Sequence, residues 1–233
     1  MKSILARIAL GLLIIPVAFV FVRGPGSALA AAPSSVPAPL IDNPLAAKPG
    51  QETAVFAGGC FWGIQAVYQH TIGVKSAVSG YTGGHIASPS YEQVSSGQSG
   101  HAEVVRVVFD PSKVSYGQLL RIFFAVAHDP TQLNRQGPDV GTQYRSEIFV
   151  TNKAQQKIAS AYIAQLGNAK VFSRPIVTKV SSLGAFTVAE DYHQNYAAEH
   201  PNDIYIRIND APKVEALKKE FKQLYKEELS AWK

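Results

Sequence analysis

The sequence of 233 residues has a single cysteine, Cys60, so the chain can form no disulfide within itself. It has no internal repeat, and no cluster of Lys and Arg stands out, which argues against a nucleic-acid-binding surface. The histidines at positions 85, 101, 128, 193 and 200 lack the spacing of metal ligands. The sequence therefore predicts neither a metal site nor a nucleic-acid partner.

The composition is that of an ordinary globular protein. Apolar residues make up 46% of the chain and charged residues 17%, which is too apolar for a disordered chain. The length predicts one domain, or one domain with extensions. The net charge of +5 falls to +2 when residues 1–30 are set aside, because Lys2, Arg7 and Arg23 lie there. The high isoelectric point thus comes mostly from the first 30 residues.

The pattern of residues 1–30 predicts a secretory signal peptide. Lys2 and Arg7 precede an apolar run at positions 8–22, and Ala28-Leu29-Ala30 resembles a cleavage site for a signal peptidase. The run is short for a membrane span. We therefore expect an exported, periplasmic protein. The alternative is a retained N-terminal membrane anchor with an exported domain, which Arg23 after the run favours slightly. No cysteine lies near this segment, which excludes a lipoprotein anchor.

The 20 residues that follow the leader have a different composition. Residues 31–50 are rich in Pro, Ala and Ser and lack periodicity, which is typical of an extended linker. We therefore expect the folded domain to occupy residues 51–233.

The setting of Cys60 points to reactivity. Residues 53–57 read as a buried strand, Gly58 and Gly59 break it, and a helical apolar stripe starts at Phe61. Cys60 would then lie at a helix N-terminus, where N–H groups and the helix dipole stabilise a thiolate. Half-ionisation at neutral pH needs about 2 kcal/mol, which these two effects together can supply. The alternative is a buried cysteine that acts as a small hydrophobic residue.

Aromatic residues next to Cys60 predict an apolar pocket. Phe61 and Trp62 follow the cysteine directly, and Trp62 lies off the apolar stripe of the predicted helix. The alternative is that both are ordinary core residues. On this evidence alone the two interpretations of Phe61 are equally good.

Glu103 opens a predicted strand over residues 103–109. Strand alternation places Glu103 on the same face as Val105, Val107 and Phe109. A carboxyl group on an apolar face loses hydration, which raises its pKa and suits a general acid. The alternative is a glutamate at a strand end that reaches into solvent.

The remaining pattern predicts a two-layer α/β domain with a mixed sheet. We expect helices over 115–127 and 153–166, strands over 147–150 and 175–180, and a C-terminal helix from about Asp210. Two long polar loops interrupt these elements, one carrying Tyr91 and the other Asp139 and Tyr144. Loops of this size are typically functional or mobile, although each tyrosine taken singly could be an ordinary surface or core residue.

Five segments together resemble the peptide-methionine (S)-S-oxide reductase (MsrA) family. They are GCFWG, GYTGG, SYEQVSSGQSGHAEVVRVVFDP, HDPTQLNRQGPDVGTQYRS and AEDYHQNY. The resemblance covers about residues 52–208, in the same order and spacing. It implies the fold of that family, a ferredoxin-like two-layer α/β (α+β) sandwich with a mixed sheet.

The resemblance also implies roles for particular residues. Cys60 corresponds to the nucleophile and Glu103 to the acid that protonates the sulfoxide oxygen. Phe61 and Trp62 correspond to the walls of the methyl pocket. The residues that correspond to those holding the sulfoxide oxygen are Tyr91, Asp139 and Tyr144. His193 is expected to support the site.

The reaction implied is thiolate attack on the sulfur of methionine (S)-sulfoxide, free or in proteins, which leaves Cys60 as a sulfenic acid. No cofactor is expected. Many relatives carry a second, resolving cysteine, which this chain lacks, so an external thiol such as thioredoxin, a glutaredoxin-like protein or a small thiol must reduce Cys60. We expect a monomer. The competing hypotheses are a cysteine hydrolase that pairs Cys60 with His193 or His101, and a binder of oxidised proteins without turnover.

Overall fold

The structure is a computed structural model that describes residues 36–232. The predicted leader and residues 31–35 lie outside the described residues, and so does Lys233. Within the described range, no helix is long and apolar enough to cross a membrane.

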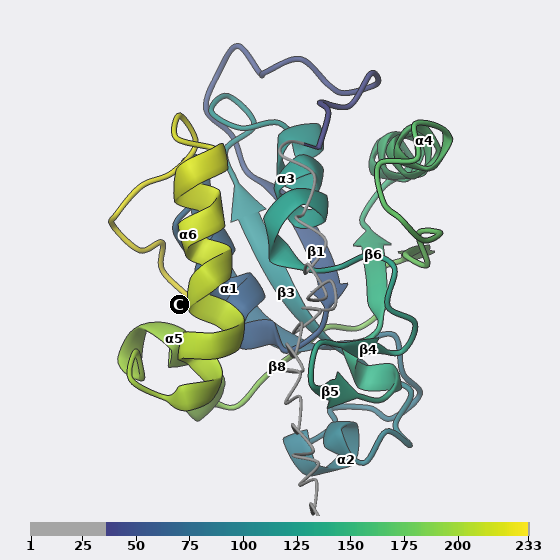
Figure 1. Ribbon diagram of the computed structural model, residues 1–233, viewed down its shortest axis with the longest axis vertical. Coiled ribbons are helices and arrows are strands. Elements are labelled where there is room, and N and C mark those ends of the chain that lie inside the picture. Colours follow the sequence, from purple (N-terminus) through teal and green to yellow (C-terminus); the bar gives the residue numbers. More distant parts are fainter. Residues whose placement is uncertain (1–35, 233) are drawn as a thin grey trace, which may run out of the picture. The chain divides into compact units, whose positions relative to one another are not determined.

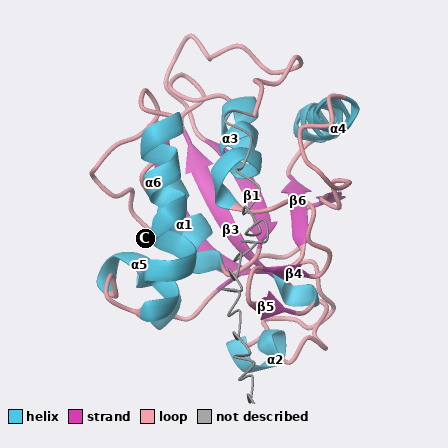
Figure 2. Ribbon diagram, viewed as in Figure 1, coloured by secondary structure: helices cyan, strands magenta, loops and turns pink. Residues whose placement is uncertain are grey.

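A six-stranded mixed sheet forms the centre of the fold, in the order β7-β6-β1-β3-β2-β8 (Figures 1 and 2). Its strands are β1 (Glu52–Gly58), β2 (Val74–Thr82), β3 (Ala102–Phe109), β6 (Ser146–Val150), β7 (Lys179–Ser182) and β8 (Thr187–Val188). The β6–β7 pair is parallel and the other pairs are antiparallel. A separate small hairpin joins β4 (Arg135–Gln136) to β5 (Asp139–Val140).

Helices surround the sheet, and some of them form a second layer on one of its faces (Figure 1). The helices are α1 (Phe61–Gln69), α2 (Tyr91–Ser95), α3 (Tyr116–Ile122), α4 (Lys153–Asn168), α5 (Tyr196–Glu199) and α6 (Ala211–Glu220). Two π-helical turns, η1 (Phe123–Ala127) and η4 (Ile206–Asp210), and two 3-10 turns, η2 (Thr142–Tyr144) and η3 (Asp191–His193), complete the set. In Figure 1, α1, α3 and α6 lie on one face of the sheet. The predicted two-layer α/β fold with a mixed sheet is thus confirmed.

The main hydrophobic core lies between the sheet and the helices. Val105, Val107 and Phe109 of β3 point into it, together with Phe56 of β1, while Val104 belongs to a smaller cluster on the opposite face. The predicted alternation along β3 is therefore confirmed. The smaller cluster is covered by the β7–β8 connection, where Phe186 stacks beneath a guanidinium group of β3.

Helix starts follow local capping chemistry. Ser115 and Gln118 form a reciprocal capping box at the start of α3, and Asn152 caps α4. Both predicted helices are present, although the first ends as the π-helical turn η1. The predicted strand over 175–180 starts only at Lys179, because the preceding residues bond to the polar loop instead, as the 2.8 Å bond from Val177 N to Pro130 O shows.

The segment 36–50 is not a free linker. Val36 is 2% exposed and its carbonyl oxygen accepts a 2.7 Å hydrogen bond from Arg121 Nε. The carboxylate of Asp42 accepts a 2.9 Å bond from the backbone N–H of Gly117, in the first turn of α3. The linker prediction is therefore wrong for residues 36–50, which lack helix and strand but belong to the folded unit. The sequence does not reveal these contacts, because contacts made by the backbone and by a capping carboxylate produce no hydrophobic periodicity.

Candidate active site

Cys60 lies at the N-cap of α1, directly after β1. Gly59 connects the two elements with φ of +104°, a conformation that favours glycine. A Cβ at Gly59 would lie 2.5 Å from the Cγ atom of Gln136, so this turn packs tightly against β4. The predicted strand–turn–helix around Cys60 is therefore present.

Glu103 is buried beside the same helix start. It is 2% exposed, and its Oε2 atom accepts a 3.1 Å hydrogen bond from the backbone N–H of Phe61. Burial raises its pKa from 4.5 to about 8, although the Phe61 N–H opposes this shift. The glutamate does not reach into solvent, and its carboxyl group is protonated at neutral pH.

The thiol of Cys60 departs from expectation. Burial raises its pKa well above 9.0, and the negative charges of Glu103 and Asp210 raise it further. The backbone N–H of Trp62 lowers the pKa, but by less than burial raises it. The expectation of a thiolate half-ionised by the helix start is therefore wrong for the substrate-free pocket. Desolvation of a fully buried thiol outweighs the helix dipole.

A cavity of about 200 Å³ gathers the predicted residues into one place. Its lining consists of Cys60, Phe61, Trp62, Tyr91, Glu103, Asp139, Tyr144 and Tyr205. Tyr91 comes from α2, Asp139 from β5 and Tyr144 from η2, so both polar loops contribute to the cavity. The loops are thus ordered around Cys60.

Trp62 is held by three aromatic neighbours from the segment after β8. Its Nε1–H donates a 3.2 Å hydrogen bond to Nδ1 of His193, and its ring stacks on Tyr196 at 3.8 Å between centroids. Tyr205 meets it edge-on at 5.8 Å. His193 is buried and does not line the cavity. Because Nδ1 accepts this hydrogen bond, the neutral imidazole ring of His193 carries its hydrogen on Nε2.

The tyrosines of the cavity keep their phenolic hydrogens. Burial raises the pKa of Tyr91 to about 12, and it also raises the pKa of Tyr144. Their hydroxyl groups therefore remain donors over the physiological range. Tyr205 donates a 2.5 Å hydrogen bond to Oδ2 of Asp139, which ties the C-terminal segment to the β4–β5 hairpin.

Comparison with known proteins places this chain in a family. A family model described as peptide methionine sulfoxide reductase matches residues 52–225. The chain belongs to this family. The resemblance predicted from the sequence is therefore confirmed, and so is membership of a family of reductases.

Relatives and solved structures agree with this assignment. The chain is 56% identical to peptide methionine sulfoxide reductase MsrA 2 of Mesorhizobium japonicum, over 78% of this chain and 93% of that protein. It is 52% identical to MsrA of Deinococcus radiodurans, over 76% and 86%. Reduced Mxr1 of Saccharomyces cerevisiae superposes with a TM-score of 0.60 at 30% identity, over 70% of this chain and 92% of that one. Methionine sulfoxide reductase A of Corynebacterium diphtheriae gives 0.56 at 33% identity, over 72% and 87%.

Tyr205 is the lining residue that sequence reasoning missed. It lies in the stretch 203–207, where no motif or periodicity singles it out, and only the fold shows that it immediately precedes η4 and lines the cavity. One feature of the sequence could have identified Tyr205, since this residue lies within the family resemblance, which extends to about residue 208. A tyrosine near the end of that range could have been included among the candidates.

The histidines proposed for a hydrolase do not line the cavity of Cys60. His101 Nε2 bonds to the carbonyl oxygen of Ile86 at 2.8 Å, and His193 Nδ1 is occupied by Trp62. Neither His101 nor His193 therefore provides a general base beside the Cys60 thiol. Within residues 36–232, no three His, Cys, Asp or Glu side chains converge as a metal site would require.

Proposed function

We propose that this protein reduces methionine (S)-sulfoxide, free or within proteins, to methionine. The observation that carries the proposal is the shared cavity of Cys60 and Glu103, in which Glu103, with a pKa of about 8, keeps its proton at neutral pH. A sulfoxide needs both a nucleophile at sulfur and a proton donor at oxygen. A hydrolase would need a base beside the thiol, and neither candidate histidine lines the cavity.

The first step joins the Cys60 sulfur to the sulfoxide sulfur while Glu103 gives its proton to the sulfoxide oxygen. The carboxylate that results takes the thiol proton, so the substrate itself triggers ionisation of a thiol that is neutral in the empty pocket. The sulfur–oxygen bond then breaks as the protonated oxygen takes a second proton from Glu103 and leaves as water. A water molecule attacks the Cys60 sulfur and returns a proton to Glu103, the sulfur–sulfur bond breaks, methionine leaves, and Cys60 becomes a sulfenic acid. The substrate sulfur gains two electrons and the Cys60 sulfur loses two.

The other lining residues divide into two groups by chemistry. Phe61 and Trp62 supply apolar surface for the methyl group of the substrate, and His193 fixes the orientation of the Trp62 ring. Tyr91, Tyr144 and Asp139 face the same cavity with polar groups. Their tyrosine hydroxyls donate hydrogen bonds to the sulfoxide oxygen, where negative charge grows in the transition state.

Cys60 returns to the thiol with the help of an external reductant. One thiol displaces water from the sulfenic acid to form a mixed disulfide, and a second thiol releases Cys60 as the reductant becomes a disulfide. We propose thioredoxin, a glutaredoxin-like protein or a small thiol in this role, since Cys60 is the only cysteine. The enzyme needs no other cofactor and acts as a monomer.

We also propose that the enzyme repairs exported proteins, because the first 30 residues have the pattern of a signal peptide. Expression of the full chain in a bacterium, followed by periplasmic extraction and mass mapping of the mature N-terminus, tests this. A start at Ala31 in the periplasm supports export with cleavage, whereas a membrane-bound chain that retains Met1 supports the anchor. Recovery in the cytoplasm would contradict both.

A single-turnover experiment tests the reaction. The protein is mixed with excess racemic methionine-sulfoxide peptide without reductant, and products are resolved by chiral chromatography. We expect about one equivalent of methionine, consumption of the S epimer alone, and a dimedone adduct on Cys60. Added dithiothreitol should permit many turnovers. Hydrolysis of an ester or amide instead would contradict the proposal, and an absence of conversion would favour a binding protein.

A further inference from the structure

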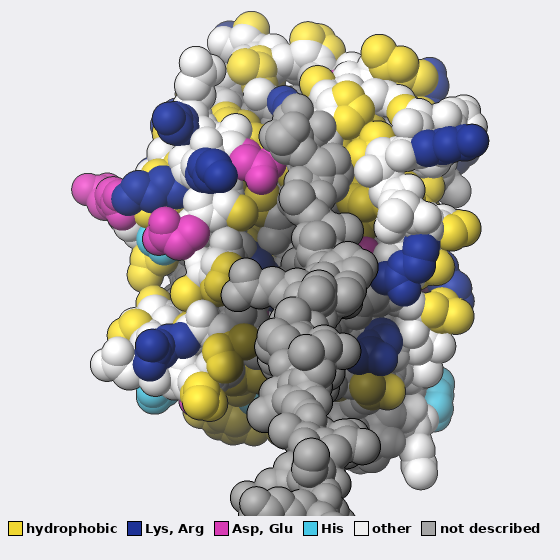
Figure 3. Space-filling view, viewed as in Figure 1, with side chains coloured by type: hydrophobic (Ala, Val, Ile, Leu, Met, Phe, Trp, Pro, Cys, Tyr) yellow, Lys and Arg dark blue, Asp and Glu magenta, His cyan; other side chains and the backbone are white. Residues whose placement is uncertain are grey.

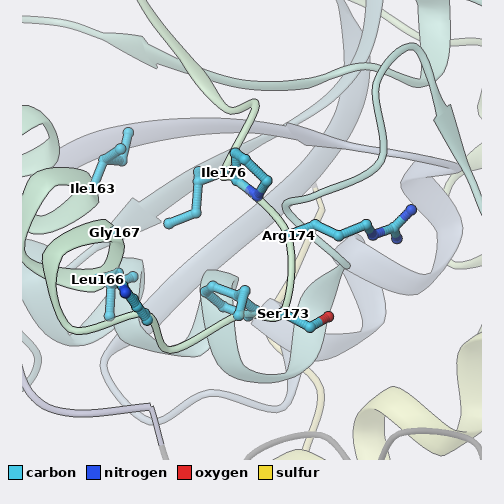
Figure 4. A pocket seen from close by; sticks show the side chains of 9 residues that line it. Ile163, Leu166, Gly167, Ser173, Arg174 and Ile176 are labelled. Atoms are coloured by element: carbon cyan, nitrogen blue, oxygen red, sulfur yellow. The ribbon is translucent and has the colours of Figure 1, made fainter.

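A groove of about 660 Å³ lies outside the active site, at the C-terminal end of α4. Ile163 and Leu166 of α4 lie across it from Ile176, with Phe172 completing an apolar lining (Figure 4). Its volume falls within the range of ligand-binding pockets. The proposed reaction leaves this groove without a role.

The rim of the groove is basic. Lys170 and Arg174 line it, and both are exposed. The chain from residue 148 to residue 189, which supplies every residue of the groove, contains no Asp or Glu. The other basic residues of this stretch, Lys153, Lys157 and Lys179, are exposed as well. One acidic group touches the rim, since Arg174 Nη2 lies 3.4 Å from Oδ2 of Asp129, but this exposed contact engages a single guanidinium nitrogen. The rim therefore favours an anionic ligand.

The groove is connected to Cys60 by a short series of contacts. Arg174 contacts Asp129, whose backbone exchanges two 3.1 Å hydrogen bonds with the side-chain amide of Gln136. Gln136 packs against Gly59, the residue before Cys60. Arg174 also lines a neighbouring hollow with Arg135 at the start of the hairpin that carries Asp139. The hairpin thus contributes Asp139 to the active-site cavity and Arg135 to the hollow that Arg174 also lines.

We propose that this groove is an exosite for an extended, acidic segment of the polypeptide that is being repaired. Apolar side chains of that segment enter between α4 and Ile176, and its carboxylates meet Lys170 and Arg174. The inference rests on the proposed reductase function. It assigns the enzyme a preference for oxidised methionines in extended acidic and apolar sequence. A concave apolar lining with a basic rim suits such a segment better than it suits a flat lipid surface.

The backbone at Lys170 supports a role for its side chain. The end of α4 forms a Schellman motif, in which Val171 N donates to Leu166 O at 3.1 Å and Lys170 N to Gly167 O at 3.0 Å. Lys170 occupies the left-handed position of this motif with φ of +50°, where glycine is favoured. A lysine there gives up local stability and places a charge on the rim of the groove.

The test uses methionine-sulfoxide peptides with and without an acidic, apolar arm. Arms of about six and about twelve residues, on either side of the methionine, reach up to roughly 20 and 40 Å when extended. We expect the full protein to show a KM for one of the long-arm peptides about tenfold below that of the short peptide. Lys170→Glu and Arg174→Glu should each raise that KM by about fivefold and abolish its dependence on salt.

Matched variants separate this effect from net charge and from folding. Lys157→Glu makes the same change of charge on α4, outside the groove, and it should keep the arm preference. Lys170→Gly removes the charge at a position that favours glycine, so it should lose preference without losing thermal stability. Turnover of the short peptide should stay within about twofold of wild type in all four variants.

Several outcomes would overturn the exosite. The first is that the wild type has equal KM values for the short and long peptides, and the second is that it prefers arms with basic residues as much as acidic arms. The third is that Lys170→Glu and Arg174→Glu slow only the turnover that thioredoxin drives. The last result would assign the groove to the reductant. If the short peptide itself is not reduced, the proposed function fails instead. In that case, fluorescence anisotropy of a labelled acidic, apolar arm without methionine tests the exosite by itself. The wild type must bind this arm more tightly than Lys170→Glu does.

Discussion

Burial acts on Cys60 and Glu103 in the same direction, because it disfavours the charged form of each acid. A negative charge on Glu103 would also raise the pKa of the Cys60 thiol. The empty pocket therefore holds a neutral thiol next to a neutral carboxyl group at pH 7, and in the proposed mechanism charge develops only when a sulfoxide enters. This arrangement protects a buried nucleophile from adventitious oxidation, since the thiolate is the reactive form.

The pH dependence of catalysis follows from Glu103. Because the proposed mechanism requires Glu103 to be protonated, kcat/KM should fall as pH rises through about 8, the pKa of its carboxyl group. Glu103→Gln should lower kcat/KM by about 10²–10⁴ and should remove this decline. Steady-state rates from pH 6 to pH 9 with dithiothreitol check both outcomes. A variant with the wild-type rate would refute the role of Glu103 as the acid.

Stability should depend on pH through the same group. The folded-state pKa of about 8 lies above the ordinary value of 4.5, so the native state retains a proton that the unfolded chain loses. The contribution is fully favourable below about pH 4.5 and is lost as pH rises to about 8. Urea denaturation at about pH 5 and about pH 9 should show this loss for the wild type but not for Glu103→Gln.

Tyr205 is predicted to position Asp139. Tyr205→Phe removes the hydrogen bond to the carboxylate but keeps the ring against Trp62. Bonds to charged groups contribute about 1.5–3 kcal/mol, so kcat/KM should fall by about tenfold or more while the fold is retained. Kinetics and circular dichroism of the variant test this, with Tyr192→Phe as a control at an exposed tyrosine. Equal losses in both variants would contradict the assignment.

Among the elements, the turn between β1 and α1 controls the placement of the nucleophile. It requires a left-handed residue at Gly59 and closely approaches Gln136 of β4. The β4–β5 hairpin brings Asp139 to the cavity. The contact between Gly59 and Gln136 therefore couples the position of Cys60 to that of Asp139.

Gly59→Ala should therefore damage activity more than stability. The left-handed backbone costs a non-glycine residue about 1–2 kcal/mol, and the new methyl group would displace Gln136 and the hairpin. We expect a drop in melting temperature of several degrees and a loss of kcat/KM of about 10²-fold, as small misplacements near reacting groups produce. Gly184→Ala is the matched control, because a Cβ at Gly184 meets nothing within 4 Å. Wild-type activity in Gly59→Ala would refute the coupling.

Prediction of elements from sequence succeeded where local chemistry is strong. The capping residues Ser115 and Asn152 and the apolar stripe after Cys60 predict helices that the structure contains. Strand β2 was not predicted, because Ser79 and Gly80 interrupt its apolar pattern. Gly80 is needed in the fold, since a Cβ there would lie 2.4 Å from the ring of Phe186. The need for glycine at position 80 thus comes from a segment that is distant in the sequence, so no local sequence pattern reveals it.

At the scale of the whole molecule, the segment 36–50 extends the domain beyond its family motifs. It packs along α3 and α4 through Val36 and Asp42, and residues 38 and 40 bond to the side chain of Gln165 on α4. This segment thus braces α4, the helix that carries the proposed exosite.

Removal of this segment should destabilise the protein. A chain that starts at residue 36 should unfold like one that starts at residue 31, whereas a chain that starts at residue 51 should lose about 2–4 kcal/mol of unfolding free energy. Urea titration of the three purified chains measures this. Equal stability for all three would restore the interpretation of residues 36–50 as a linker.

The sequence by itself indicated the family through five motif segments. It also indicated the fold class and made Cys60 and Glu103 candidates for nucleophile and acid, because a helix start and strand alternation are local patterns. The tertiary structure decided what depends on burial and on distant neighbours. It brought residues from two polar loops to one cavity, added Tyr205, made the Cys60 thiol neutral, and joined residues 36–50 to the domain. Desolvation and packing are properties of the folded chain, so no local pattern could reveal them.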